Sequence, residues 1–150
     1  MVMIGRIAGA LCLALLVMGA TGAAKDGTKG GAKTDSLKYR NCMALVQEKP
    51  EEAYRMATTW SQEAGGRPAR HCAAAAMIGM GMPAEAARRL EDLAREKGTK
   101  KPGMRGNLLA QAASAWIIAG KPKSAYALQT RALKLRPRDV ELLIDRSVSL

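Results

Sequence analysis

The side chains able to do chemistry are few in this chain of 150 residues. It has one histidine, His71, so neither a histidine pair nor a histidine-based metal cluster can form. The sequence contains no glycine-rich phosphate loop, serine-centred nucleophile elbow or CxxC motif. Its carboxylates stand beside Lys or Arg at helical spacing, which is typical of ion pairs on a helix surface. We therefore predict no catalytic site, no cofactor and no metal, and hence a protein that is not an enzyme.

Sulfur atoms give a weak metal signal. Met77, Met80 and Met82 stand close together, and thioethers favour copper(I) in an oxidising compartment. Methionine also commonly fills irregular gaps between packed helices. We expect these methionines in the core and His71 as a partly exposed residue, with a ligand role for either as the alternative.

Helical segments must position these side chains. In residues 107–137, small and apolar residues recur at three- and four-residue spacing on both sides of Gly120-Lys121-Pro122. Glycine can close one helix and proline can open the next, so this stretch predicts two antiparallel helices. The pattern recurs around Gly81-Met82-Pro83, 39 residues earlier, and more faintly around Lys49-Pro50. An insertion in the loop 97–106 would explain the long spacing between the second and third units.

The third unit resembles the tetratricopeptide repeat, whose period is roughly 34 residues. Six residues fall where that family places its aromatic residue, turn glycine, two small residues, leucine and closing proline: Trp116, Gly120, Ala125, Ala132, Leu133 and Pro137. The resemblance covers about residues 34–150. It implies an all-α fold, a right-handed α-solenoid of antiparallel helix hairpins with about three and a half repeats. Trp60 stands where alanine is usual, so we expect irregular packing there. A generic alanine-rich helical bundle is the alternative.

The N-terminal segment is expected to lie outside this fold. Residues 1–24 combine one positive charge, Arg6, with an apolar run and a small-residue end, the layout of a secretory signal peptide. An uncleaved anchor at the inner membrane is the alternative. Residues 25–36 are rich in Gly, Lys and Thr and predict a flexible basic linker. The repeat domain is then expected over residues 37–150, in the periplasm.

The chain is strongly basic, with 24 Lys and Arg against 13 Asp and Glu and a formal charge of +11. The basic residues gather in the loop after residue 96 and along the hairpin after residue 120, without interleaved aromatic residues that could stack on bases. We expect no nucleic acid partner. Solvated helix faces are the simplest interpretation, and weak attraction to anionic lipid or to an acidic partner is the alternative.

The resemblance also implies a groove along the first helices of successive units, which in the family holds a peptide or a partner helix. Carried over by position, nine residues would line it: Lys38, Cys42, His71, Ala75, Asn107, Ala110, Gln111, Ser114 and Ile118. Members that bind chaperone C-terminal carboxylates use five polar clamp residues, of which only Lys38 is matched here, so that ligand is disfavoured. We expect an adaptor for another protein or peptide. The alternative is an envelope accessory subunit that uses its basic surface.

The positional comparison also brings Cys42 and Cys72 together, because in clamp-type members these two positions converge on one ligand. Cys12 lies in the predicted leader and is expected to leave with it, so two cysteines remain in an oxidising compartment. First helices about 9 Å apart would bring the two Cα atoms within reach of a bridge. We expect a disulfide, with two buried free thiols or a reactive pair as the alternatives.

The last stretch, residues 139–150, predicts a first helix without a second one. Its apolar residues are too many for a polar cap of a repeat array: Val140, Leu142, Leu143, Ile144, Val148 and Leu150. We therefore expect Leu142, Leu143 or Ile144 to be exposed.

Overall fold

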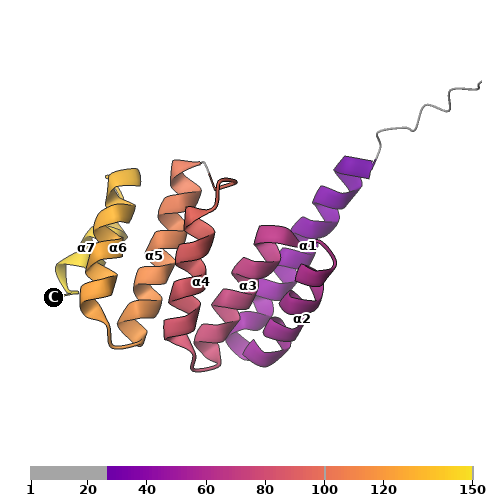
Figure 1. The fold of residues 1–150 in the computed structure, drawn as a ribbon, viewed down its shortest axis with the longest axis horizontal. Helices are drawn as coiled ribbons and strands as arrows, with labels where there is room; N and C mark the ends of the chain where they lie inside the picture. Colours follow the sequence, from indigo (N-terminus) through magenta and orange to yellow (C-terminus); the bar gives the residue numbers. More distant parts are fainter. Residues whose placement is uncertain (1–26, 100, 150) are drawn as a thin grey trace, which may run out of the picture.

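Seven helices follow one another along the part of the chain that the computed structural model describes, residues 27–99 and 101–149, and this part contains no strand. The helices are α1 (Gly27–Glu48), α2 (Pro50–Gln62), α3 (Gly66–Gly79), α4 (Pro83–Arg95), α5 (Pro102–Ile118), α6 (Pro122–Leu135) and α7 (Val140–Ser147). Each packs on its neighbours in sequence, and α1 also packs on α3 (Figure 1). The prediction of an all-α fold is confirmed. None of the described helices is long and apolar enough to cross a bilayer.

Proline and glycine set many of the helix boundaries. Four helices begin with proline, whose fixed φ suits the first helical position and whose missing N–H costs nothing there: Pro50, Pro83, Pro102 and Pro122. Gly81 and Gly120 follow α3 and α5 with φ of 76° and 69°. After Gly120, the N–H of Lys121 donates to the carbonyl oxygen of Trp116 at 2.8 Å. The predicted hairpin turns are therefore present at both glycines.

The core divides into a leucine-rich and a leucine-poor part. The larger cluster runs from α3 to α7 and contains six buried leucines: Leu90, Leu93, Leu108, Leu109, Leu128 and Leu142. The cluster between α1, α2 and α3 contains only alanines, Val46, Cys42 and Cys72 as its buried members. The cluster between α1, α2 and α3 is thus made of smaller side chains than the leucine-rich cluster.

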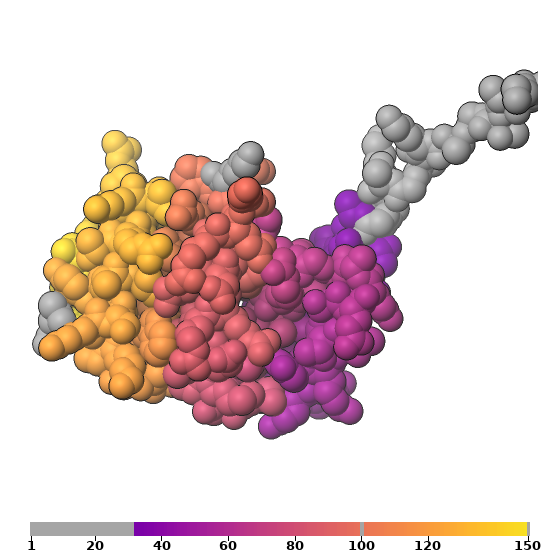
Figure 2. Space-filling model, in the orientation of Figure 1, coloured from indigo at the N-terminus to yellow at the C-terminus, as the bar shows by residue number. Residues whose placement is uncertain are grey.

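The first helix begins earlier than predicted. α1 starts at Gly27, so residues 27–36 are helical where the sequence predicts a flexible linker ahead of a domain that begins at residue 37. Once a helix exists, each added residue gains a hydrogen bond, and no proline interrupts this segment. The side chains of residues 32–37 are exposed, and this end of α1 projects beyond the other helices (Figure 2). The predicted leader, residues 1–24, lies outside the described residues.

The third unit also begins earlier than predicted. Gly106 and Asn107 lie inside α5, which starts at Pro102. The expected loop over residues 97–106 is therefore wrong in its second half. The physical reason is Pro102, which can open a helix because the first turn needs no N–H donor there. α5, with 17 residues, is correspondingly longer than α3, with 14.

Trp60 is buried within a regular helix, so the irregularity expected for α2 lies in the turn that follows. Ala64 there has a φ of 72°, a left-handed conformation that favours glycine. A Cβ atom on the next residue, Gly65, would lie 2.7 Å from the Trp60 ring. The turn makes room for the large side chain.

The methionine cluster is only partly in the core. Met77 is buried, whereas Met82 is 38% exposed in the turn before α4. The expectation of core packing is therefore wrong for Met82, because the residue lies in the connection after the Gly81 turn rather than on a packed helix face.

The last helix exposes part of its apolar side, as predicted. Leu142 packs into the core with 4% of its surface exposed, while Leu143 and Ile144 are 44% and 59% exposed. Asp139 begins the helix by accepting a hydrogen bond from the Leu142 N–H at 3.0 Å.

Candidate binding site

A hollow of about 590 Å³ lies between the N-terminal halves of α1, α3 and α5. Its lining comes from these three helices: Ala32, Asp35, Ser36, Tyr39, Arg67, Pro68, His71, Met104, Asn107, Leu108 and Gln111. The three helices are the first members of successive hairpins. The hollow therefore spans three units of the fold.

His71 is buried at the base of the hollow and is bonded on both sides. The Tyr39 hydroxyl donates to His71 Nδ1 at 2.8 Å, and His71 Nε2–H donates to Gln111 Oε1 at 2.7 Å. A neutral ring satisfies both bonds, with Nδ1 accepting and Nε2 donating. Burial lowers the pKa of His71, opposed by the bond to Gln111, and burial raises the pKa of Tyr39. One uncharged chain of hydrogen bonds thus links α1, α3 and α5.

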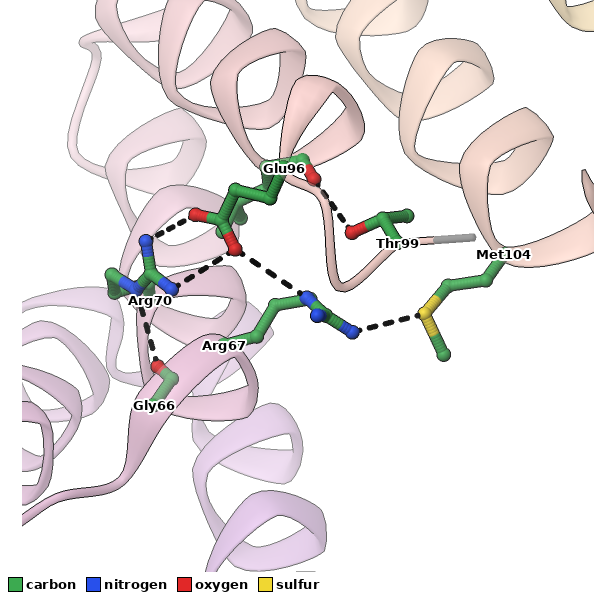
Figure 3. A network of polar contacts seen from close by, with 7 residues as sticks. Gly66, Arg67, Arg70, Glu96, Thr99 and Met104 are labelled. Carbon is green, nitrogen blue, oxygen red and sulfur yellow. Dashed lines mark hydrogen bonds and ion pairs between the residues drawn. The ribbon is translucent and has the colours of Figure 1, made fainter. Parts of the chain in front are cut away.

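One wall of the hollow is held in place by an ion-pair network (Figure 3). The Arg70 guanidinium binds both carboxylate oxygens of Glu96, and Arg67 Nε lies 3.5 Å from Glu96 Oε2. Arg67 also donates to the Met104 sulfur at 3.5 Å. A Cβ atom on Gly98 would overlap the Arg67 guanidinium. The network ties the connection between α4 and α5 to α3 and fixes Arg67 beside the hollow.

Three of the predicted groove residues meet in the hollow: His71, Asn107 and Gln111. His71 is 9% exposed, so the expectation of a partly exposed residue is wrong. The cause is the pair of hydrogen bonds, which satisfies both ring nitrogens away from water. Asn107 Oδ1 accepts a hydrogen bond from Arg136, which fixes its amide at the rim.

Lys38 and Cys42 do not line the hollow. The Lys38 ammonium lies 3.2 Å from the Glu63 carboxylate and faces a different depression, beside α2. Cys42 is fully buried. Successive residues of a helix point about 100° apart, so Tyr39 takes the position that the comparison assigned to Lys38.

The remaining predicted residues also lie outside the hollow. Ala75 packs against the cluster between α1 and α3, and Ala110 packs against the leucine-rich cluster. The Ser114 hydroxyl donates to the Ala110 carbonyl of its own helix at 3.2 Å. Ile118 is 62% exposed at the far end of α5. The groove predicted from the family positions is thus shorter than expected and shifted to the N-terminal ends of the helices.

Sequence reasoning missed Tyr39, Arg67 and Met104. The available signal was helical spacing, because Ala32, Asp35, Ser36 and Tyr39 are three or four residues apart and share one face of a helix. Treating residues 25–36 as a linker hid that face.

Cys42 and Cys72 also meet as predicted. Their sulfur atoms lie at bonding distance, with Cα atoms 6.3 Å apart. Both residues are fully buried, and the pair joins α1 to α3 next to the hollow.

No family model, curated protein or solved structure matches this chain. The site is therefore interpreted from its own residues. Across residues 27–99 and 101–149, no three His, Cys, Asp or Glu side chains are grouped so that they could hold a metal ion. The hollow combines the polar groups of Tyr39, Arg67 and two amide side chains with apolar surface. Such a lining is typical of a site that binds a ligand.

Proposed function

We propose that this chain is a tetratricopeptide-like adaptor, a right-handed solenoid of helix hairpins, that binds a segment of another protein without catalysis. The observation that carries the proposal is the hollow to which the first helices of three successive hairpins contribute. In such an array the first helices present one shared surface.

The chemistry of the hollow suits a polypeptide ligand. Pro68, Leu108 and Met104 offer apolar surface to a side chain, and the amides of Asn107 and Gln111 can exchange hydrogen bonds with a peptide backbone. The volume of about 590 Å³ is enough for a few side chains of a segment and too small for a folded domain.

We propose the periplasm as the location. The sequence supports this with the leader-like layout of residues 1–24. The buried pair of Cys42 and Cys72 supports it too, because disulfides persist in oxidising compartments. Retention at the inner membrane by an uncleaved leader is the second candidate, and sequencing the N-terminus of the protein isolated from cells distinguishes the two.

Site-specific photo-crosslinking tests the proposed binding site. A photo-reactive amino acid in place of Met104, which lines the hollow and is 43% exposed, should capture a defined polypeptide from an envelope extract. The same amino acid in place of Lys134 on α6 is the matched control and should not capture it.

A second variant ties the capture to the hollow. Ser36→Trp fills the space from the exposed side of α1 and should abolish crosslinking from position 104, while Arg40→Trp on the same helix should leave it unchanged. Far-UV circular dichroism should be equal for both variants. Equal capture in the presence of Ser36→Trp would show that the hollow is not where the partner binds.

A further inference from the structure

Most of the basic residues of the chain do not line the hollow, in which Arg67 is the one Lys or Arg side chain among the described residues. Between Glu96 and Asp139 the sequence has no acidic residue. That stretch contains ten basic residues: Lys97, Lys100, Lys101, Arg105, Lys121, Lys123, Arg131, Lys134, Arg136 and Arg138. Like charges gathered in one region repel one another unless acids elsewhere in the chain or anions from outside compensate them.

The second helices of two neighbouring units show how unusual this is. On α4, every arginine forms an ion pair with an acid of the same helix: Arg88 and Arg89 with Glu85, and Arg95 with Glu91 and Asp92. On α6, Lys123, Arg131 and Lys134 form no ion pair within residues 27–99 and 101–149. α4 therefore compensates its own charge, and α6 does not.

The turn between α5 and α6 adds apolar surface to this charge. Ile117 and Ile118 are 43% and 62% exposed at the end of α5. Lys121 and Lys123, both exposed, follow within five residues of Ile118. We call these four residues, Ile117, Ile118, Lys121 and Lys123, the isoleucine-lysine edge.

The turn between α3 and α4 adds apolar surface at the same end of the molecule. It presents Met82, which is 38% exposed (Figure 1). Glu85, the acid in the first turn of α4, is paired with Arg88 and Arg89, whose hydrogen bonds lower the pKa of its carboxyl. The hollow lies at the opposite ends of α1, α3 and α5, so it stays open when this edge is covered.

We propose that the isoleucine-lysine edge binds the surface of an anionic lipid bilayer. Exposed isoleucines can enter the boundary between headgroups and acyl chains, and lysines beside them can keep their ammonium groups among lipid phosphates. An acidic protein surface would match the lysines, but it would match the isoleucines only where an apolar patch lies beside its acids, whereas an anionic bilayer offers both along its whole surface. The bilayer accounts for both halves of the edge, and this inference does not depend on what the hollow binds.

Vesicle binding of the full chain tests this inference. The probe is vesicles of phosphatidylcholine with added phosphatidylglycerol, compared with pure phosphatidylcholine. Lys121→Gln/Lys123→Gln should lower the affinity for anionic vesicles about 25-fold, since each lysine near such a surface contributes about fivefold. Arg131→Gln/Lys134→Gln removes the same charge about 15 Å farther along α6, beyond the Debye length of about 8 Å at physiological salt, and should change affinity less than about threefold. Residues 1–24 are the same in all variants, so any contribution that they make to vesicle affinity cancels when the variants are compared.

A second variant and a second readout separate the bilayer from other occupants. Ile117→Ser/Ile118→Ser should remove the part of the binding that survives at high ionic strength. Amide hydrogen exchange around residues 117–123 should slow with anionic vesicles in the unsubstituted chain. If Lys121→Gln/Lys123→Gln and Arg131→Gln/Lys134→Gln lost vesicle affinity equally, the isoleucine-lysine edge would not be the binding site. Lys121→Gln/Lys123→Gln could instead bind vesicles as tightly as the unsubstituted chain and lose binding to soluble polyglutamate. That result would overturn the proposal of a bilayer and favour an acidic polypeptide as the partner.

Discussion

The region formed by α1, α2 and α3 and the region formed by α4, α5 and α6 build the same kind of helix packing from different side chains. The second region buries leucines between its helices, such as Leu90, Leu109 and Leu128. The cluster between the helices of the first region contains alanines, Val46 and the two cysteines as its buried members, and Trp60 is buried outside that cluster. Smaller buried side chains give less hydrophobic stabilisation. The first region adds a pair of sulfurs at bonding distance and the hydrogen bond from Tyr39 to His71, which shows how weaker packing can be supplemented by specific links.

The turns that follow α2 and α5 also differ in the residue that adopts a left-handed conformation. After α5, the left-handed position is taken by Gly120, which adopts it without strain. After α2, the corresponding position past the helix end is taken by Ala64, and the following Gly65 must remain without a side chain because of Trp60. The turn between α2 and α3, which joins two successive hairpins, thus carries a strained residue, whereas the turns within hairpins at Gly81 and Gly120 carry the favoured one.

The largest effect is expected from the cysteine pair. Cys42→Ala/Cys72→Ala should lower the free energy of unfolding by about 3 kcal/mol, because a bridge that closes a loop of 30 residues restricts the unfolded chain. Urea unfolding measures the loss. Amide hydrogen exchange should become faster in α1–α3 and change little in α4–α6.

Reduction provides the control for that experiment. Dithiothreitol should destabilise the unsubstituted chain by a similar amount and leave the double variant unchanged. Peptide mapping of unreduced protein should recover residues 42 and 72 in one linked species. Recovery of both as free thiols would leave the first region without its proposed support.

The next largest change in stability is expected from replacing Gly65 by alanine, with Gly103 as the matched control. Gly65→Ala should destabilise the protein by about 2 kcal/mol, because the new Cβ would lie 2.6 Å from the Trp60 carbonyl oxygen and backbone has to move. Gly103→Ala on α5 meets no atom within 4 Å and should stabilise by about 0.5 kcal/mol through helix propensity. Thermal unfolding of both variants tests the contrast, and a neutral Gly65→Ala would show that the turn is not tightly packed.

The same contrast explains what the sequence could predict. The hairpin turns at Gly81 and Gly120 and the all-α fold follow from local periodicity and from residue types with strong backbone preferences. The pairing of Cys42 and Cys72 is expected from the positions that the family resemblance assigns to them. The early start of α1 carries no such local signal, because glycine and lysine side chains do not distinguish a solvated helix end from a flexible tail. Tyr39 lies inside the predicted domain and is missed for a different reason: the position carried over from the family falls on Lys38, one residue away.

A smaller effect is expected from exchanging the turn residues. Ala64→Gly should stabilise the protein by up to about 1 kcal/mol, because glycine adopts the φ of 72° without the clash of a Cβ atom. Gly120→Ala should destabilise it by about 1 kcal/mol for the same reason in reverse. Chemical denaturation of the two variants decides the matter, since equal signs would contradict the assignment of strain to the first region.

The smallest effect concerns His71, which connects the two regions through Tyr39 and Gln111. Its pKa in the fold lies below the ordinary value of 6.5 because burial disfavours the charged ring. The unfolded chain therefore takes up a proton at a pH where the folded chain does not. The stabilisation from the neutral ring is complete above about pH 6.5 and is lost as the pH falls from there towards the lower folded pKa.

His71→Asn should remove this part of the pH dependence, so the difference in free energy of unfolding between it and the unsubstituted chain should shrink as the pH falls below 6.5. Tyr39→Phe keeps the titrating ring and serves as the control. It should lower stability through the lost hydrogen bond to Nδ1 while retaining a decline towards acid pH. Chemical denaturation at a series of pH values measures both. If the unsubstituted chain and His71→Asn declined in parallel, the link between the regions would not depend on the neutral ring, and the hydrogen-bond chain would have to be stable in its charged form.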